Sequence, residues 1–205
     1  MGYKLQVLGI GGSPRKNGNS DLMLREVLKG SKEQGLITEI AFLRDYQFSS
    51  CVGCEACRTA KTCTTLLYGM QLLYPKIIEA RGIVLASPAH NYNVSALMKA
   101  FIDRLYQFYD FTTDHPRAFS SRLAEQGRKA VVAGVAEQLE EKDMGFTMDG
   151  MRLPLEALGY EIKDRVSALG HFHKGKVGKD PQTLQACFQA GKKLAMALED
   201  SYEAS

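Results

Sequence analysis

The sequence predicts an α/β fold built on a doubly wound, parallel sheet of five strands. Short apolar runs typical of buried strands recur along the chain, and each is separated from the next by enough residues for a helix. The segments between them place apolar residues three and four positions apart, which is the pattern of a helix that covers a sheet. The expected strands lie at 4–9, 37–43, 82–87, 129–135 and 161–168.

Length and composition favour a single domain, residues 1–205, with one core. The 26 lysines and arginines stand against 23 aspartates and glutamates, which leaves a formal net charge of +3. Because these charges form no long run of one sign, we expect no binding to nucleic acid or to a charged membrane surface. No apolar run approaches the ~20 residues of a membrane span, and the first residues lack the apolar core of a signal peptide. We therefore expect a cytoplasmic protein.

The first expected strand leads into a glycine-rich loop, residues 9–20, which has the sequence GIGGSPRKNGNS and opens into a helix. Glycines let the backbone turn sharply, and a helix N-terminus presents unpaired N–H groups, so the loop suits a phosphate. Ser13, Asn19 and Ser20 offer neutral hydrogen bonds, and Arg15 offers a charged one. A bond to a charged group contributes about 1.5–3 kcal/mol, against about 0.3–1 kcal/mol for an exposed helix dipole. We therefore expect Arg15 to contribute most to phosphate binding.

Comparison with other phosphate-binding loops narrows the class of ligand that this loop could bind. A Walker A loop ends in Gly-Lys-Ser/Thr, but Gly18 is followed by Asn19 and Ser20 with no lysine. The dinucleotide motif Gly-x-Gly-x-x-Gly has Pro14 at its third glycine position here. What remains is a one-phosphate site at the first strand-to-helix turn, the flavodoxin-like arrangement for FMN, with strand order 2-1-3-4-5. An ordinary Gly/Pro/Asn surface turn is the alternative.

The second expected strand leads into a cysteine-rich insertion, residues 44–65, that holds four of the five cysteines. These four are Cys51, Cys54, Cys57 and Cys63. Three sulfurs at a spacing of three residues can reach one small cluster, and the fourth can fold back to complete four thiolate ligands. Ordering about 15 residues costs roughly 15–30 kcal/mol, and this segment has few apolar residues to offset that cost. A bound metal would offset much of it.

The cysteine spacing leaves four interpretations open, of which a [4Fe-4S] cluster is the leading hypothesis. Structural zinc more often uses two separated Cys-x2-4-Cys pairs. A redox disulfide would join two of the thiols, for example Cys54 and Cys57, and unligated thiols are the fourth interpretation. Cys187 stands apart on the apolar face of the last expected helix, where we expect a buried thiol.

The third expected strand is followed by the loop Ser-Pro-Ala-His-Asn-Tyr-Asn at 87–93. In a sheet of order 2-1-3-4-5 the carboxyl ends of the first and third strands flank the ligand crevice, so this loop shares a site with the phosphate loop. We expect Asn91 and Asn93 to hydrogen-bond the pyrimidine edge of an isoalloxazine ring and Tyr92 to cover the ring. The same composition also suits an ordinary turn.

Three segments together resemble the iron-sulfur flavoprotein branch of the NAD(P)H-dependent FMN reductase superfamily: residues 12–20, the four-cysteine motif, and residues 87–104. The resemblance runs in register across nearly the whole chain. It implies FMN, a [4Fe-4S] cluster on the four cysteines, and a homodimer or homotetramer. The cofactor contacts that it implies are Ser13, Arg15, Asn19, Ser20, Pro88, Ala89, His90, Asn91, Tyr92, Asn93 and Gly134.

These observations favour a flavin-dependent oxidoreductase that moves electrons among a reduced donor, FMN and the cluster. The expected donor is NAD(P)H or a reduced ferredoxin. Since the flavin carries the chemistry, we expect no catalytic acid or base from the protein. Two alternatives stay open. One is an NAD(P)H-dependent reductase of FMN or quinone without a cluster, and the other is a flavodoxin-like electron carrier with no turnover of its own.

Overall fold

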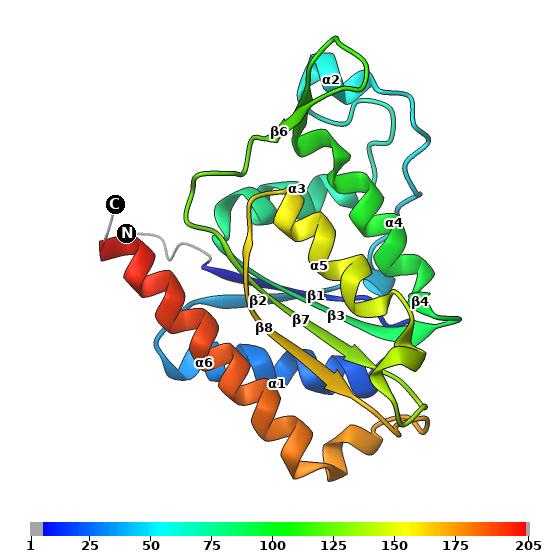
Figure 1. Cartoon of the computed structure of the whole chain (residues 1–205), viewed down its shortest axis with the longest axis vertical. Helices are drawn as coiled ribbons and strands as arrows, with labels where there is room; N and C mark the ends of the chain where they lie inside the picture. The colour runs from blue at the N-terminus through cyan, green and yellow to red at the C-terminus, as the bar shows by residue number, and fades with distance from the viewer. Residues whose placement is uncertain (1–5, 204–205) are drawn as a thin grey trace.

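A computed structural model describes residues 6–203, and its centre is one parallel sheet (Figure 1). The strands lie in the order β2-β1-β3-β7-β8, so the predicted order 2-1-3-4-5 is confirmed, with β7 and β8 as its fourth and fifth strands. Residues 4–5 of the first predicted strand lie outside the described residues. The five strands are β1 (Val7–Gly11), β2 (Thr38–Phe42), β3 (Gly82–His90), β7 (Lys129–Val135) and β8 (Glu161–Ala168).

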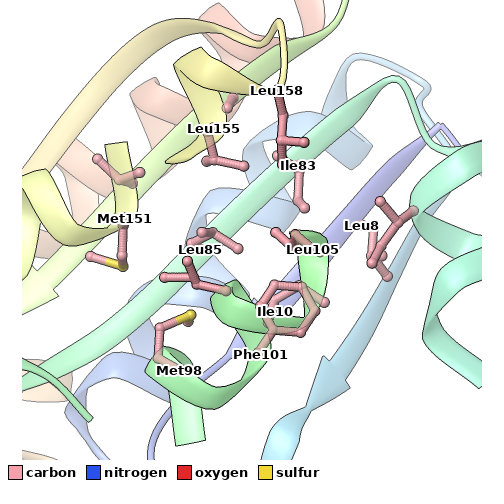
Figure 2. Packing of buried hydrophobic residues seen from close by; sticks show 14 of the residues in the cluster. Leu8, Ile10, Ile83, Leu85, Met98, Phe101, Leu105, Met151, Leu155 and Leu158 are labelled. Atoms are coloured by element: carbon pink, nitrogen blue, oxygen red, sulfur yellow. The ribbon is translucent and has the colours of Figure 1, made fainter. Parts of the chain in front are cut away.

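Helices cover both faces of this sheet, because successive strand side chains point to opposite faces (Figure 1). Helices α1 (Asn19–Glu33) and α6 (Pro181–Glu203) lie on one face. Helices α3 (Met70–Glu79), α4 (Ala96–Arg104) and α5 (Thr147–Ala157) lie on the other. Figure 2 shows the core beneath the second group, where the labelled side chains are Leu8, Ile10, Ile83, Leu85, Met98, Phe101, Leu105, Met151, Leu155 and Leu158.

Helices α1 and α6 approach each other closely enough for their backbones to touch. A Cβ on Gly30 would lie 2.1 Å from the carbonyl oxygen of Phe188, and one on Gly191 would lie 1.9 Å from that of Val27. The hydroxyl of Ser31 donates to the Gly191 carbonyl at 3.0 Å. The long last helix is thereby fixed against α1, the helix whose N-terminus follows the phosphate loop.

The third strand extends further than the sequence predicts. It continues past Ser87 to His90 and turns back into β4 (Asn93–Val94), which pairs antiparallel with it. The two turn residues, Asn91 and Tyr92, have φ of 49° and 64°, the conformation of a two-residue type I′ hairpin. The turn composition noted in the sequence is therefore used for a hairpin at the edge of the candidate site.

The apolar pattern of the sequence predicts the second helix over 66–80, with a kink or a new start at Pro75, but α3 begins only at Met70. Gly69 precedes it with φ of 28°, and a Cβ there would lie 2.4 Å from the carbonyl oxygen of Gln47. The helix continues through Pro75 because Leu73 and Ile77 beside it are buried in the core. Packing therefore outweighs the hydrogen bond that the proline removes.

The cysteine segment and the connection after η2 (Leu105–Phe108), residues 109–128, come together at the end of the molecule that is away from the sheet (Figure 1). The cysteine segment, residues 44–65, contains α2 (Ala56–Ala60), and the later connection forms a hairpin of β5 (Tyr109–Phe111) and β6 (Phe119–Ser121). Glu55 pairs with Arg117 across them at 3.2 Å. Short 3-10 helices complete the described chain: η1 (Leu43–Asp45), η2 (Leu105–Phe108), η3 (Glu141–Met144) and η4 (Lys176–Lys179). Within residues 6–203 no helix is long and apolar enough to cross a membrane.

Candidate functional site

A cavity of about 270 Å³ opens at the carboxyl ends of β1 and β3. Its walls come from four segments that are distant in sequence: the phosphate loop, the end of β3, the residues after β7, and the loop that follows β8. Nine of the predicted cofactor residues line it, namely Ser13, Arg15, Asn19, Ser20, Pro88, Ala89, His90, Asn91 and Tyr92. The topology therefore brings the two predicted binding loops to one place, as the strand order requires.

Two predicted contacts, Asn93 and Gly134, do not line this cavity. The Oδ1 atom of Asn93 accepts from the backbone N–H of Val94 at 2.8 Å, so the side chain is bonded within β4. A Cβ on Gly134 would lie 2.4 Å from Sδ of Met148, so this glycine makes room for a core methionine. Contact of either residue with a flavin remains a prediction.

The phosphate loop holds its shape through its own hydrogen bonds. Ser13 Oγ accepts from the backbone N–H of Arg15 at 3.1 Å and donates to the Arg15 carbonyl at 3.2 Å. Ser20, in the first turn of α1, is 1% exposed, yet its Oγ has no hydrogen-bond partner in the described part of the chain. The hydroxyl that is free to bind a ligand therefore belongs to Ser20, and that of Ser13 shapes the loop.

Asn19 connects the phosphate loop to the loop after β8 instead of facing the cavity with free donors. Its Nδ2 donates to the carbonyls of His171 and His173 at 3.1 and 3.0 Å, and its Oδ1 accepts from the N–H of Val177 at 3.2 Å. Both amide protons are thus in use. A phosphate contact by Asn19 therefore depends on its backbone N–H, which is one of the unpaired donors at the start of α1.

Arg44 supports the phosphate loop from below. Its guanidinium, in η1 after β2, forms two contacts with the Asp21 carboxylate, at 2.8 and 3.0 Å, and donates to the Ser13 carbonyl at 3.0 Å. Asp21 is fully buried and also accepts from the backbone N–H of Asn17 at 2.8 Å. The ion pair thus joins the first residue of the cysteine segment to the phosphate loop at Ser13 and, through Asp21, at Asn17.

The helix after the β3–β4 hairpin is tied to the same loop. Ser95 caps α4 by accepting from the N–H of Met98 at 3.2 Å, and its hydroxyl donates to the Gly12 carbonyl at 2.5 Å. Its own N–H donates to Ser87 Oγ at 3.0 Å. One serine therefore sets the spacing between the phosphate loop and the end of β3.

The β3–β4 hairpin presents Asn91 and Tyr92 at the mouth of the cavity, where Tyr92 is 65% exposed. A bulky residue with positive φ is unusual, and here the Tyr92 carbonyl is held by the N–H of Phe146 at 2.8 Å. Gly145 lies against the same residue, since a Cβ on it would be 2.3 Å from the Tyr92 carbonyl oxygen. The strained tyrosine is thus fixed by the segment that follows β7.

Charged side chains of opposite sign line different parts of the cavity. Arg15 and Lys174 contribute positive charge beside the start of α1, and the Arg15 guanidinium lies 5.8 Å from the ring centroid of Phe172. Glu137 and Asp143 contribute negative charge from the segment after β7. An anionic group is favoured on the α1 side, where the helix dipole adds to the two cations.

The four predicted cluster ligands line a second cavity, of about 360 Å³, next to α4 and η2. Cys51 and Cys54 are exposed, and Cys57 and Cys63 are partly buried. Among residues 6–203, no three potential ligands lie close enough together to hold a metal ion. The donor set, four thiols around one cavity, suits an iron-sulfur cluster, but the described conformation does not gather them around one point.

Arg104 and Gln107 hold the cysteine segment from the side of the sheet. Arg104 is 3% exposed and donates to the carbonyls of Ser49 and Leu66, and its Nη2 lies 3.5 Å from Cys63 Sγ. The Gln107 side chain accepts from the N–H of Cys63 at 2.8 Å. The buried guanidinium of Arg104 therefore lies beside Cys63, where it would stabilise the negative charge of thiolates.

The thiols are not equivalent. Burial raises the pKa of Cys57, and the other three thiols of the segment raise it further. A hydrogen bond with Thr65 lowers the pKa of Cys54. Cys187 is a buried thiol on the last helix, as predicted, and this burial raises its pKa to about 12.

The strand order defines a flavodoxin-like protein, and its cavity lies at the ends of β1 and β3, where such folds bind their ligands. Residues 5–136 match the model of the NADPH-dependent FMN reductase family. An iron-sulfur flavoprotein of Archaeoglobus fulgidus is 30% identical over 198 residues, which cover 97% of this chain and 82% of that protein. The chain belongs to the iron-sulfur flavoprotein branch of the NADPH-dependent FMN reductase superfamily, as the resemblance of the motifs predicts.

A second iron-sulfur flavoprotein and a solved structure are also similar to this chain. An iron-sulfur flavoprotein of Methanocaldococcus jannaschii is 38% identical over 100 residues, so the match spans about half of each protein, 49% of this chain and 51% of the relative. The solved structure of an FMN-dependent NADH-azoreductase from Bacillus anthracis, in complex with FMN, has a TM-score of 0.68. It is 17% identical, and the match covers 93% of this chain and 99% of that one, which shows the shared fold.

Sequence patterns did not reveal four residues of the site, namely Asp21, Arg44, Arg104 and His171. Asp21, Arg44 and Arg104 act through partners 23 or more residues away, and His171 contacts Asp180 nine residues away, so no short motif marks them. One signal pointed to the Asp21–Arg44 pair, because a buried carboxylate requires a cation beside it and few lysines or arginines follow the second strand. Composition alone could not identify which of these cations pairs with Asp21.

Proposed function

We propose that this chain is an FMN-dependent oxidoreductase in which electrons pass between a reduced donor, FMN and a [4Fe-4S] cluster on Cys51, Cys54, Cys57 and Cys63. The observation that carries the proposal is the cavity at the switch point of the sheet, which combines a helix N-terminus, the cation Arg15 and the buried, unpartnered hydroxyl of Ser20. These groups fit a phosphate. When bound, FMN would supply the hydride and electron chemistry.

The residues of the chain then act by binding and positioning. Ser20 Oγ, the Arg15 guanidinium and the first N–H groups of α1 hold the phosphate, and Arg44 keeps the loop in shape. The hairpin residues Asn91 and Tyr92 face the ring, with the backbone from Pro88 onward along its edge. No side chain of the cavity is assigned to proton transfer.

The first experiment measures whether the phosphate part of the site works as proposed. The purified chain, freed of flavin, is titrated with FMN and with riboflavin, and flavin fluorescence is followed. We expect Arg15→Ala to weaken FMN binding by roughly tenfold or more, because a hydrogen bond to a charged group is lost, and to leave riboflavin binding unchanged. Lys16→Ala is the matched control, since Lys16 is exposed and does not line the cavity. Failure of the parent protein to bind FMN would contradict the proposal.

The second experiment concerns the cysteines. Protein isolated without oxygen is assayed for iron and sulfide, and its absorption spectrum is recorded. We expect Cys54→Ala to lose the iron and to keep FMN, and Cys187→Ala, the matched control from the core, to keep both. Zinc in place of iron would support the reductase without a cluster, and full iron content in the Cys54 variant would contradict the ligand assignment.

The electron donor and the assembly are part of the same proposal. Steady-state turnover with NADH, NADPH and reduced ferredoxin distinguishes an enzyme from an electron carrier, which would show exchange without net turnover of a substrate. A homodimer or homotetramer is supported by exposed apolar side chains in and after the cysteine segment, and light scattering measures the assembly directly. These side chains are Val52, Leu67, Tyr68, Leu72 and Ile78.

A further inference from the structure

Two buried polar atoms of the residues that line the cavity have no hydrogen-bond partner within residues 6–203. One is Ser20 Oγ, which the proposed phosphate site already uses, and the other is Nδ1 of His171. The His171 side chain is only 9% exposed. Burying a polar atom without a partner is unfavourable, so an unpaired nitrogen on a residue that lines a ligand cavity points to a ligand atom that pairs with it.

Two backbone hydrogen bonds hold His171 in place, and one contact holds its ring. Its backbone N–H donates to the Ala136 carbonyl at 2.9 Å, and its carbonyl accepts from Asn19 Nδ2 at 3.1 Å. Its Nε2 lies 3.0 Å from Oδ2 of Asp180. Asp180 does not line the cavity and occupies Nε2, so the nitrogen left for a cavity ligand is Nδ1.

The partner of Nε2 determines what Nδ1 can do. The Asp180 carboxylate accepts from the N–H and the hydroxyl of Thr183 at 3.1 and 2.6 Å, and these bonds, followed by that of His171, lower the pKa of Asp180. An ionised carboxylate only accepts, so Nε2 carries the proton and Nδ1 of the neutral ring is a bare acceptor. Nδ1 can donate to an anion only after the ring takes up a second proton.

We propose that His171 is a further phosphate-binding residue, which takes up one proton from solvent at Nδ1 as the FMN phosphate binds and then donates that N–H to a phosphate oxygen. This inference rests on the proposed function, because it needs the phosphate at the start of α1 beside Ser20. It makes phosphate binding and proton uptake one event. Affinity for FMN, but not for riboflavin, then increases as the pH falls.

Other charged and titratable groups lie on the segments packed around the cavity and the His171 ring. Arg15 comes from the phosphate loop, His90 from the β3 hairpin, and Glu137 and Asp143 from the segment after β7. The buried pair of Asp21 in α1 and Arg44 in η1 lies beneath the phosphate loop, and the loop of His171 itself carries His173, Lys174 and Lys176. Asp180 contacts the ring from the start of α6. Only histidines among these ordinarily titrate between pH 6 and 8, so a histidine variant isolates the effect.

The test uses the full chain freed of flavin, titrated with FMN and with riboflavin at pH 6, 7 and 8. The variants are His171→Gln and, as a matched control, His173→Gln, whose exposed side chain lies two residues away outside the cavity lining. At pH 6 we expect His171→Gln to bind FMN roughly tenfold to a hundredfold more weakly than the parent, since a charge-assisted hydrogen bond is lost. The ratio shrinks toward pH 8, and riboflavin affinity is equal in all three proteins. A phosphate ester gains its own proton near pH 6, and the comparison between variants cancels this effect.

A second measurement needs no variant. Calorimetry of FMN binding at pH 7.5, in two buffers of different ionisation enthalpy, reports the protons taken up, and we expect uptake with FMN and none with riboflavin. Equal FMN affinity of the parent and His171→Gln at every pH, or binding without proton uptake, overturns the inference and leaves the proposed function intact. A parent that binds neither flavin overturns the proposed function itself.

Discussion

Arg44 and Asp21 form a buried, two-contact ion pair beneath the phosphate loop, with Nη2 of the arginine 2.8 Å from Oδ2 of the aspartate. The same guanidinium donates to the carbonyl of Ser13, and the same carboxylate accepts from the N–H of Asn17. The pair therefore holds the phosphate loop at Ser13 and at Asn17. Its arginine belongs to the cysteine segment, so the two candidate sites share a structural element.

Asp21→Asn should unfold at a lower urea concentration than the parent. Removing one partner of a buried ion pair costs about 3–5 kcal/mol, and the lower end applies here because the Arg44 side chain keeps 12% exposure. FMN affinity should also fall, since a single amide oxygen cannot keep both the Arg44 contacts and the bond from the Asn17 N–H, so the loop is held less firmly. The control is Asp45→Asn, whose exposed carboxylate is 4.0 Å from Arg44 and should change stability by less than about 0.5 kcal/mol. Equal unfolding midpoints for the two variants would show that the pair does not support the loop.

Tyr92→Gly should weaken FMN binding without lowering the thermal stability of the protein. The left-handed conformation of Tyr92, φ 64°, costs about 1–2 kcal/mol for a residue with a side chain, while glycine costs about 0.5–1 kcal/mol in chain entropy. Thermal unfolding should therefore change little or shift upward. FMN affinity should fall because the ring at the cavity mouth is lost, and Tyr92→Phe should preserve it. A glycine variant with full FMN affinity contradicts the ring contact.

Gly191→Ala should destabilise the protein although alanine favours a helix. The propensity gain is about 1 kcal/mol, but the new Cβ would lie 1.9 Å from the Val27 carbonyl oxygen, and forcing apart packed backbones costs about 1–3 kcal/mol or more. We expect a net loss, measured as a lower urea midpoint. Gly178→Ala is the control, because its nearest neighbour would be Leu22 Cδ1 at 3.4 Å. A variant as stable as the parent would mean that α1 and α6 separate easily.

Asp180→Asn should have a pH-dependent effect on stability. Hydrogen bonds from Thr183, and then from His171, lower the pKa of Asp180 in the folded protein below its unfolded value of about 3.9. The stabilisation is therefore present above about pH 4 and is lost as the pH falls toward the lower folded pKa. Asparagine still accepts from the Thr183 N–H, so the cap of α6 survives. Urea midpoints at pH 7, 5 and 3 should differ from the parent most at pH 7 and converge at pH 3.

The fold was predictable because apolar periodicity reports burial directly, and strand order follows from where a one-phosphate site lies in such a sheet. Helix boundaries were less accessible, as α3 shows, because Gly69 and the packing of Leu73 determine them through distant contacts. The cavity residues of the two loops were found from local composition. The separate roles of these residues could not be predicted, because the Asn19 side chain donates to carbonyls of a loop more than 150 residues away.

The position of Arg44 restricts how this architecture can be rebuilt. Excising the insertion at 44–65 would also remove the cation that Asp21 and the Ser13 carbonyl require, so the cofactor loop would be damaged by a cut made elsewhere. Grafting only the cysteine segment onto another flavodoxin scaffold would likewise leave behind Arg104 of α4, which donates to the carbonyls of Ser49 and Leu66. The two candidate sites therefore cannot be exchanged separately, and a redesign has to transplant them together.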